Sequence, residues 1–178
     1  IFARFSAESF AKGKVSDIEL PDELKQLTQA QTRIMLSEMS RSLAFERMQF
    51  PKKLSTMIAS QIDQGAAIEF SQYKRDLDHA QMARKVMQNV FNEGVDLIIA
   101  PSAIGEAPSI REGTGDPLFC RSWTLLGLPC INLNISTGPN GLPIGVQLIA
   151  AYGQDQFLLS AARAFALALP DPVLRDQA

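Results

Sequence analysis

The chain has 178 residues, of which 46% are hydrophobic and 20% charged, and its formal net charge at pH 7 is −2. This length and composition allow one sizeable core and exclude a disordered chain. The absence of a basic excess excludes a nucleic-acid groove. No apolar run reaches the ~20 residues that a membrane-spanning helix needs. Neither nucleic acid nor a membrane is therefore expected as a partner.

Cysteine and histidine are scarce, with two cysteines and one histidine in the whole chain. These are too few for a zinc site, so no metal is expected. Neither cysteine lies in a C-x-x-C pair, and such sparse usage fits a reducing compartment. The composition therefore predicts a cytoplasmic protein.

The chain begins at Ile1 without an initiator methionine, and the phenylalanines near this end already show helical spacing. We expect an opening helix that ends at Gly13, since glycine suits the position after a helix. We also expect the chain to be a piece of a longer protein. Residues 14–20 alternate apolar and polar side chains imperfectly and predict a short strand.

The next segment predicts two helices. Apolar residues recur at helical spacing from Leu24 onward, which predicts one long amphipathic helix that ends before Pro51. Ser55 is suited to capping a shorter helix, which Gly65 is expected to stop.

A third helix is expected to begin at a Ser71 cap and to end at Gly94. The almost wholly apolar run over residues 95–101 then predicts a strand buried on both faces. Residues 102–118 form a loop rich in glycine and proline. Its length makes it a candidate functional loop.

The last third of the chain predicts a hairpin between two helices. A turn of helix is expected over residues 119–126, and a final helix over residues 155–169. Alternating residues in 131–136 and 144–150 predict two strands, because glycine, proline and asparagine gather in the turn at 137–143.

Helices that alternate with buried strands, together with one hairpin, predict an α/β fold with a mixed β-sheet flanked by helices. No repeat or linker divides the sequence, so we expect residues 1–178 to belong to one domain.

Serine-based motifs give no active site. Two Ser-x-x-Lys sequences, Ser9–Lys12 and Ser71–Lys74, match the spacing in which a helical lysine activates a serine. Such short matches arise by chance, and no K-T-G motif accompanies them. His79 lies beside Asp78, away from the apolar side of its helix, and is expected to face solvent.

Three further polar or nucleophilic residues have structural interpretations. Cys120 has no histidine nearby in the sequence, so a nucleophilic role is not expected. Cys130 lies among apolar residues and is expected to be a small buried hydrophobe. Gln147 is polar within an apolar strand, and we expect its amide to satisfy backbone groups of a neighbouring loop rather than to contact substrate.

Three motifs around the hairpin resemble the C-terminal part of the amidase signature family. They are G-L-P-C-I-N-L-N from Gly127, G-L-P-I-G-V-Q-L-I from Gly141 and D-Q-F-L-L-S-A-A from Asp155. Upstream, I-E-L-P at Ile18 and the strand that ends in Pro101 are similar to the family pattern. The resemblance covers nearly the whole chain and implies the C-terminal portion of the amidase signature fold.

The resemblance implies a chemistry whose reacting groups lie elsewhere. Family members use a serine nucleophile, a second serine in a cis peptide and a lysine base, with backbone N–H groups that hold the oxyanion. The glycine- and serine-rich run that carries them does not occur in this chain. The implied function is therefore part of an amide hydrolase, without cofactor, whose N-terminal catalytic half is absent. Two alternatives remain open, namely the A subunit of a glutamyl-tRNA amidotransferase and a non-catalytic amidase-like scaffold.

Within this portion the resemblance suggests Asp116, Arg121 and Trp123 as substrate-binding residues. Asp116 and Arg121 could bind a charged end of the substrate, and Trp123 could line the pocket for an apolar end. Each also has a structural alternative: a turn residue, a surface or helix-terminal residue and a core anchor, respectively. The expected partners are a small-molecule amide and the N-terminal half of the same protein. Exposed apolar surface could also produce a homo-oligomer.

Overall fold

The computed structural model describes residues 15–169, whose contacts group into two compact units. The helical unit spans Pro21–Val86, and the sheet unit contains the described residues before Pro21 together with those from Met87 onward. The opening helix expected up to Gly13 lies outside the described residues.

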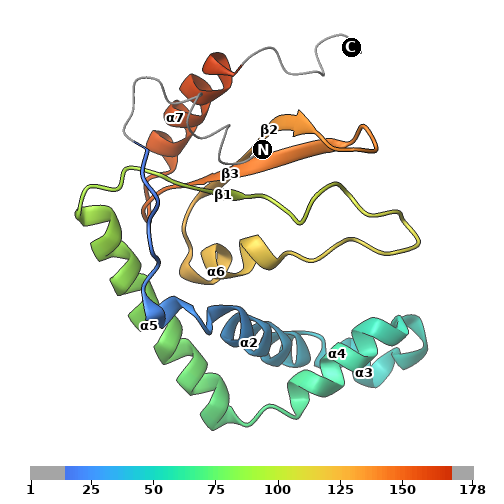
Figure 1. Ribbon diagram of the computed structural model, residues 1–178. Coiled ribbons are helices and arrows are strands. Elements are labelled where there is room, and N and C mark those ends of the chain that lie inside the picture. The colour runs from blue at the N-terminus through green and yellow to red at the C-terminus, as the bar shows by residue number, and fades with distance from the viewer. Residues whose placement is uncertain (1–14, 170–178) are drawn as a thin grey trace. The chain divides into compact units, whose positions relative to one another are not determined.

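The helical unit consists of short and long helices (Figure 1). In chain order they are the 3-10 helix η1 (Asp22–Leu24), α2 (Leu27–Ser42), α3 (Ala44–Gln49), the 3-10 helix η2 (Pro51–Lys53), α4 (Thr56–Ala66) and the first part of α5 (Phe70–Asn92). The long helix expected from Leu24 to Pro51 is therefore divided. Its backbone leaves helical geometry at Leu43, with φ −102° and ψ 16°.

Two serine caps were expected in this unit, and the structure confirms one. The Ser55 side chain accepts a hydrogen bond from the Ile58 N–H at 3.3 Å and caps α4. Ser71 does not cap α5, because that helix already begins at Phe70. The Ser71 hydroxyl instead donates to the Glu69 carboxylate at 3.2 Å.

Helices α2 and α4 pack closely through Gly65, which was expected to stop α4. The helix continues to Ala66, and Gly65 is buried inside it. A Cβ atom at this position would lie 1.9 Å from the Leu36 carbonyl oxygen and 3.0 Å from the Ser40 Cβ. Glycine is therefore needed for the close approach of the two helices rather than for ending one of them.

The sheet unit holds a three-stranded sheet in the order β1-β3-β2. Its elements are β1 (Ile98–Pro101), α6 (Leu118–Leu126), β2 (Cys130–Thr137), β3 (Pro143–Ile149) and α7 (Asp155–Ala168). The helix-flanked sheet and the hairpin are confirmed. Both strand pairings in the described chain are antiparallel, whereas a mixed sheet was expected.

The register gives the sheet two chemically different faces. Ala100 and Asn132 are aligned with Gln147 from either side of β3, so these three residues share one face. The opposite face packs against α7 through an apolar cluster. Its buried members are Leu148, Ala150, Leu158, Ala162 and Phe165. Figure 1 shows α7 on this side of the sheet and α6 on the other.

Two strand predictions were wrong. The run over residues 95–101 forms only the short edge strand β1, in which Ile98 is buried and the other three residues are half-buried. Three of its four residues remain partly exposed, so it is not the strand buried on both faces that the apolar sequence predicts. Residues 15–20 form no strand and are exposed.

Helix α6 ends as the sequence predicts. Gly127 takes the left-handed conformation with φ 68°, and the N–H of Leu128 donates to the Trp123 carbonyl oxygen at 3.0 Å. This pattern satisfies carbonyl groups at the end of the helix and turns the chain toward β2. Among residues 15–169, no helix is both long and apolar enough to cross a membrane.

We predict that Gly65→Ala lowers the free energy of unfolding by about 1–3 kcal/mol, because the new methyl group overlaps the α2 backbone. Chemical denaturation of the purified protein measures this change. Gln64→Ala, on the exposed side of the same helix, is the matched control and should change stability by less than ~0.5 kcal/mol. Equal stability of the glycine and alanine proteins would contradict the close packing.

Candidate functional site

The candidate substrate loop, residues 102–117, runs from the end of β1 to the start of α6. At its beginning the Ser102 N–H donates to the Gly145 carbonyl oxygen at 3.2 Å, which extends the sheet by one bond. The Ser102 hydroxyl also donates to the side-chain oxygen of Asn132 on β2. Gly145 leaves room for this contact, because a Cβ atom there would collide with the Asn132 amide.

Gln147 connects β3 to both ends of this loop. Its side-chain nitrogen donates to the carbonyl oxygens of Pro101 at 3.0 Å and Phe119 at 2.8 Å. Gln147 is only 4% exposed, so both bonds form in a nearly dry environment. The prediction that this amide satisfies backbone groups of a neighbouring loop is confirmed.

The two cysteine thiols lie on the α6 side of the sheet. Cys120 is half-buried, and its sulfur lies 3.9 Å from the Gln147 side-chain oxygen. Cys130 is exposed, so the prediction of a buried hydrophobe is wrong; the residue begins β2 on the face away from α7. Desolvation of the sulfur, with a contribution from Cys120, nevertheless raises the pKa of the Cys130 thiol to about 11. The thiol is protonated at neutral pH and is a poor nucleophile.

Asp116 and Arg121 are brought together by the turn that enters α6. One Asp116 carboxylate oxygen lies 3.1 Å from an Arg121 guanidinium nitrogen, and the side chains are 51% and 29% exposed. The ion pair is therefore partly accessible to solvent. Trp123 differs, since it is 7% exposed and buried in the structure. That burial favours the core-anchor interpretation of Trp123.

Glu106 was missed by sequence reasoning. Both oxygens of its carboxylate accept hydrogen bonds from the turn of the hairpin, contributed by Asn140 and Leu142. An acidic residue in a loop rich in glycine and proline carries no spacing signal that points to a partner 34 residues away. The sequence does indicate the position of Asn132. This residue alternates with apolar residues in β2, so its side chain faces away from α7.

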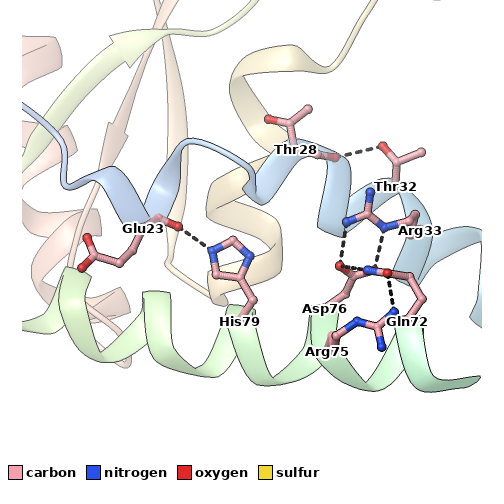
Figure 2. Close-up of polar contacts among 8 residues, drawn as sticks. All are labelled: Glu23, Thr28, Thr32, Arg33, Gln72, Arg75, Asp76 and His79. Carbon is pink, nitrogen blue, oxygen red and sulfur yellow. Dashed lines mark hydrogen bonds and ion pairs between the residues drawn. The ribbon is translucent and has the colours of Figure 1, made fainter.

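A second polar cluster lies in the helical unit, between α2 and α5 (Figure 2). The Arg33 guanidinium donates to both carboxylate oxygens of Asp76, each at 2.7 Å. Gln72, one turn earlier on α5, donates to the same carboxylate at 3.1 Å. The side chain of Asp76 is 4% exposed and that of Arg33 is 35% exposed.

His79 also belongs to this cluster. Its Nε2 atom lies 2.7 Å from the Glu23 carbonyl oxygen, and the residue is half-buried, so the side chain expected to face solvent is only partly exposed. Figure 2 shows the imidazole pointing from α5 toward η1. Arg33 and Gln72 occupy the Asp76 carboxylate, so this carboxylate joins α2 to α5.

The pKa of Asp76 is lowered, first by its hydrogen bonds from Arg33, against an opposing effect of burial. The charges of Arg33 and His79 and the Gln72 hydrogen bond act in the same direction. Within residues 15–169, no three or more histidine, cysteine, aspartate and glutamate side chains are grouped so that they could hold a metal ion.

A sequence profile of the amidase family matches residues 11–159. Among curated proteins, the A subunit of the mitochondrial glutamyl-tRNA(Gln) amidotransferase of Bos taurus is 30% identical over 118 residues, which are 59% of this chain and 22% of that protein. Its counterpart in Ralstonia nicotianae is 36% identical over 97 residues, which are 48% of this chain and 19% of that protein. The chain thus matches about a fifth of the length of these relatives.

Solved structures show the same fold. The structure of 6-aminohexanoate cyclic dimer hydrolase complexed with substrate superposes with a TM-score of 0.78 at 21% identity. The match covers 98% of this chain and 42% of the hydrolase chain. At this identity the likeness concerns the fold of the matched part.

We predict that Asp76→Asn lowers the free energy of unfolding at pH 7 by about 2 kcal/mol. This is less than the roughly 3–5 kcal/mol of a fully buried pair, because Arg33 is partly exposed. A carboxyl with a lowered pKa stabilises the fold above its unfolded pKa of about 3.9, and this contribution is lost as the pH falls through its folded pKa.

The difference between the wild-type and Asp76→Asn proteins should therefore shrink on acidification below about pH 4. Denaturation midpoints measured from pH 2 to pH 7 test this. Asp78→Asn removes an exposed carboxylate from the same helix and should leave stability unchanged. A wild-type advantage that stays constant down to pH 2 would contradict the assignment.

Proposed function

The chain belongs to the amidase family, and we propose on that premise that it forms the C-terminal part of an enzyme that hydrolyses carboxylic amides to an acid and ammonia or an amine. The observation that carries this proposal is the family match over residues 11–159, which includes the whole hairpin and the start of α7. The name of the structurally similar 6-aminohexanoate cyclic dimer hydrolase also describes a hydrolase.

The reacting groups belong, in this proposal, to an N-terminal half of the same protein. A serine there attacks the amide carbonyl, and a lysine takes its proton through a bridging serine in a cis peptide. Backbone N–H groups hold the oxyanion while the amine leaves, and water then releases the acid from the acyl-enzyme. The 178 residues alone are therefore expected to be inactive, and no cofactor takes part.

This chain contributes the sheet and the candidate substrate loop. Asp116 and Arg121 are accessible and oppositely charged, which supports a role in selecting amides that carry a charged group. Trp123 can form an apolar wall only if a substrate reaches past the residues that now enclose it, since it is 7% exposed. In this proposal Trp123 is the third substrate residue, because it lies in α6 beside Arg121 in sequence.

The A subunit of an amidotransferase is the second candidate, favoured by the curated relatives in Bos taurus and Ralstonia nicotianae. Such a protein would act with partner subunits and would release ammonia from glutamine for transfer. A non-catalytic scaffold is the third candidate and would lack the catalytic residues in the complete protein. The inactivity expected of this chain alone does not separate these candidates, whereas the activity of the complete protein does.

Compartment and assembly are part of the same proposal. Sparse cysteine usage supports a reducing, cytoplasmic location. Large exposed apolar side chains on the helical unit support packing against another segment of the protein or a second copy of it. The most exposed are Phe45 at 63%, Met48 at 76%, Met57 at 67% and Phe70 at 67%.

We expect the complete protein to release ammonia from simple amides without other subunits or added metal. Butyramide, benzamide, the cationic 6-aminohexanamide and the anionic succinamate form a suitable set, with ammonia measured by a coupled assay. Arg121→Ala should raise KM for succinamate more than for butyramide, because it removes a cation. The 178-residue chain is the inactive control. Turnover of glutamine alone, and only with partner subunits, would favour the amidotransferase and contradict the first candidate.

A further inference from the structure

Glu106 is less exposed to solvent than the other residues of the loop. Between Ala103 and Leu118 it is the single half-buried residue, and all the others are exposed. An isolated glutamate in a loop is ordinarily solvated, because a carboxylate loses hydration free energy on burial unless hydrogen bonds replace the water. The partners of Glu106 therefore explain its placement.

The carboxylate accepts hydrogen bonds at both oxygens. Oε1 lies 3.0 Å from the Asn140 backbone nitrogen and 2.9 Å from that of Leu142. Oε2 lies 3.1 Å from the same Asn140 backbone nitrogen and 2.7 Å from its side-chain nitrogen. Hydrogen bonds to a charged acceptor are about twice as strong as neutral ones, so this is the strongest polar connection between the loop and the hairpin turn.

The turn is shaped to receive this side chain. A Cβ atom at Gly138 would lie 2.4 Å from the Glu106 Cγ and Cδ atoms. The turn itself is closed by bonds from the Gly141 N–H to the Gly138 carbonyl and from the Gly138 N–H to the Leu142 carbonyl, at 3.0 and 2.9 Å. The absence of a side chain at Gly138 is thus a second, independent feature that serves the same contact.

The position of this contact in the loop matters for the candidate substrate residues. The loop is held near its start by Ser102 and Glu106, and near its end by the ion pair of Asp116 with Arg121. The residues between these points are exposed, and Ile110 is 96% exposed. Without Glu106, the loop would lose its hydrogen bonds to the hairpin turn.

We propose that Glu106 is a positioning residue, whose carboxylate fixes the candidate substrate loop to the hairpin turn and thereby holds Asp116 and Arg121 in place for substrate. This inference rests on the proposed function for its substrate, but the contact itself does not. Glu106 takes no part in the reaction; it acts through the loop.

The test uses the complete protein and three variants. Glu106→Ala removes all the bonds to the turn. Glu106→Gln can keep the two bonds at Oε1 and acts as a partial rescue. Gly138→Ala keeps the charge but displaces the carboxylate. Glu93→Ala, an exposed glutamate in the turn that follows α5, is the matched control.

In Glu106→Ala we expect KM for succinamate to rise roughly tenfold, the factor that corresponds to one lost charged hydrogen bond, with kcat within about twofold. Glu106→Gln should show less than about a third of this rise, and Gly138→Ala should resemble Glu106→Ala. Glu93→Ala should match the wild type. A structural role alone would lower kcat with the fraction of folded enzyme and leave KM unchanged. That result, or kinetics equal to the control, would overturn the positioning role.

Amide hydrogen exchange tests the contact independently of activity. The N–H groups of Asn140 and Leu142 should exchange roughly tenfold faster in Glu106→Ala than in the wild type or in Glu93→Ala, because their acceptor is gone. Unchanged exchange would overturn the contact. If the wild type hydrolyses none of the amides, the proposed function fails, and the positioning role fails with it. The exchange rates would then decide the contact alone.

Discussion

The amide of Gln147 is the constraint on which the sheet unit depends. It is 4% exposed in a strand whose neighbours Val146 and Leu148 are buried and apolar, so its polar atoms must find partners inside the protein. The partners are the carbonyl oxygens of Pro101, at the end of β1, and Phe119, in the first turn of α6. One side chain therefore fixes where the candidate substrate loop leaves the sheet and where it returns.

Other contacts specify the path of the loop between these fixed ends. Ser102 binds Asn132, Glu106 binds the hairpin turn, and Asp116 pairs with Arg121. These contacts lie at the margins of the loop and leave its middle exposed. The two faces of the sheet differ in chemistry. One face packs against α7 through apolar side chains, and the other carries the amide side chains of Asn132 and Gln147 and faces α6.

Local chemistry made part of this arrangement predictable from sequence. The hairpin, the Ser55 cap and the role of Gln147 follow from alternation, capping and the need to satisfy a buried amide. Predictions that depended on which segments pack together in space were wrong. The function of Gly65 depends on how closely α2 approaches, and the extent of the strand before Ser102 depends on which strands pair with it. Glu106 carries no periodic signal, because its partners lie in a distant turn that only the folded chain brings close.

Substituting Gln147 tests this account most directly. Gln147→Leu should lower the free energy of unfolding by about 1–3 kcal/mol, because two carbonyl groups lose their donor. Gln147→Glu should be worse at pH 8, where a carboxylate faces both oxygens. It should recover toward pH 5, because burial raises the pKa of the new carboxyl and its protonated form can donate. Gln156→Glu, at an exposed position of α7, should remain near the wild type throughout. A Gln147→Glu protein as stable as the wild type at every pH would contradict the account.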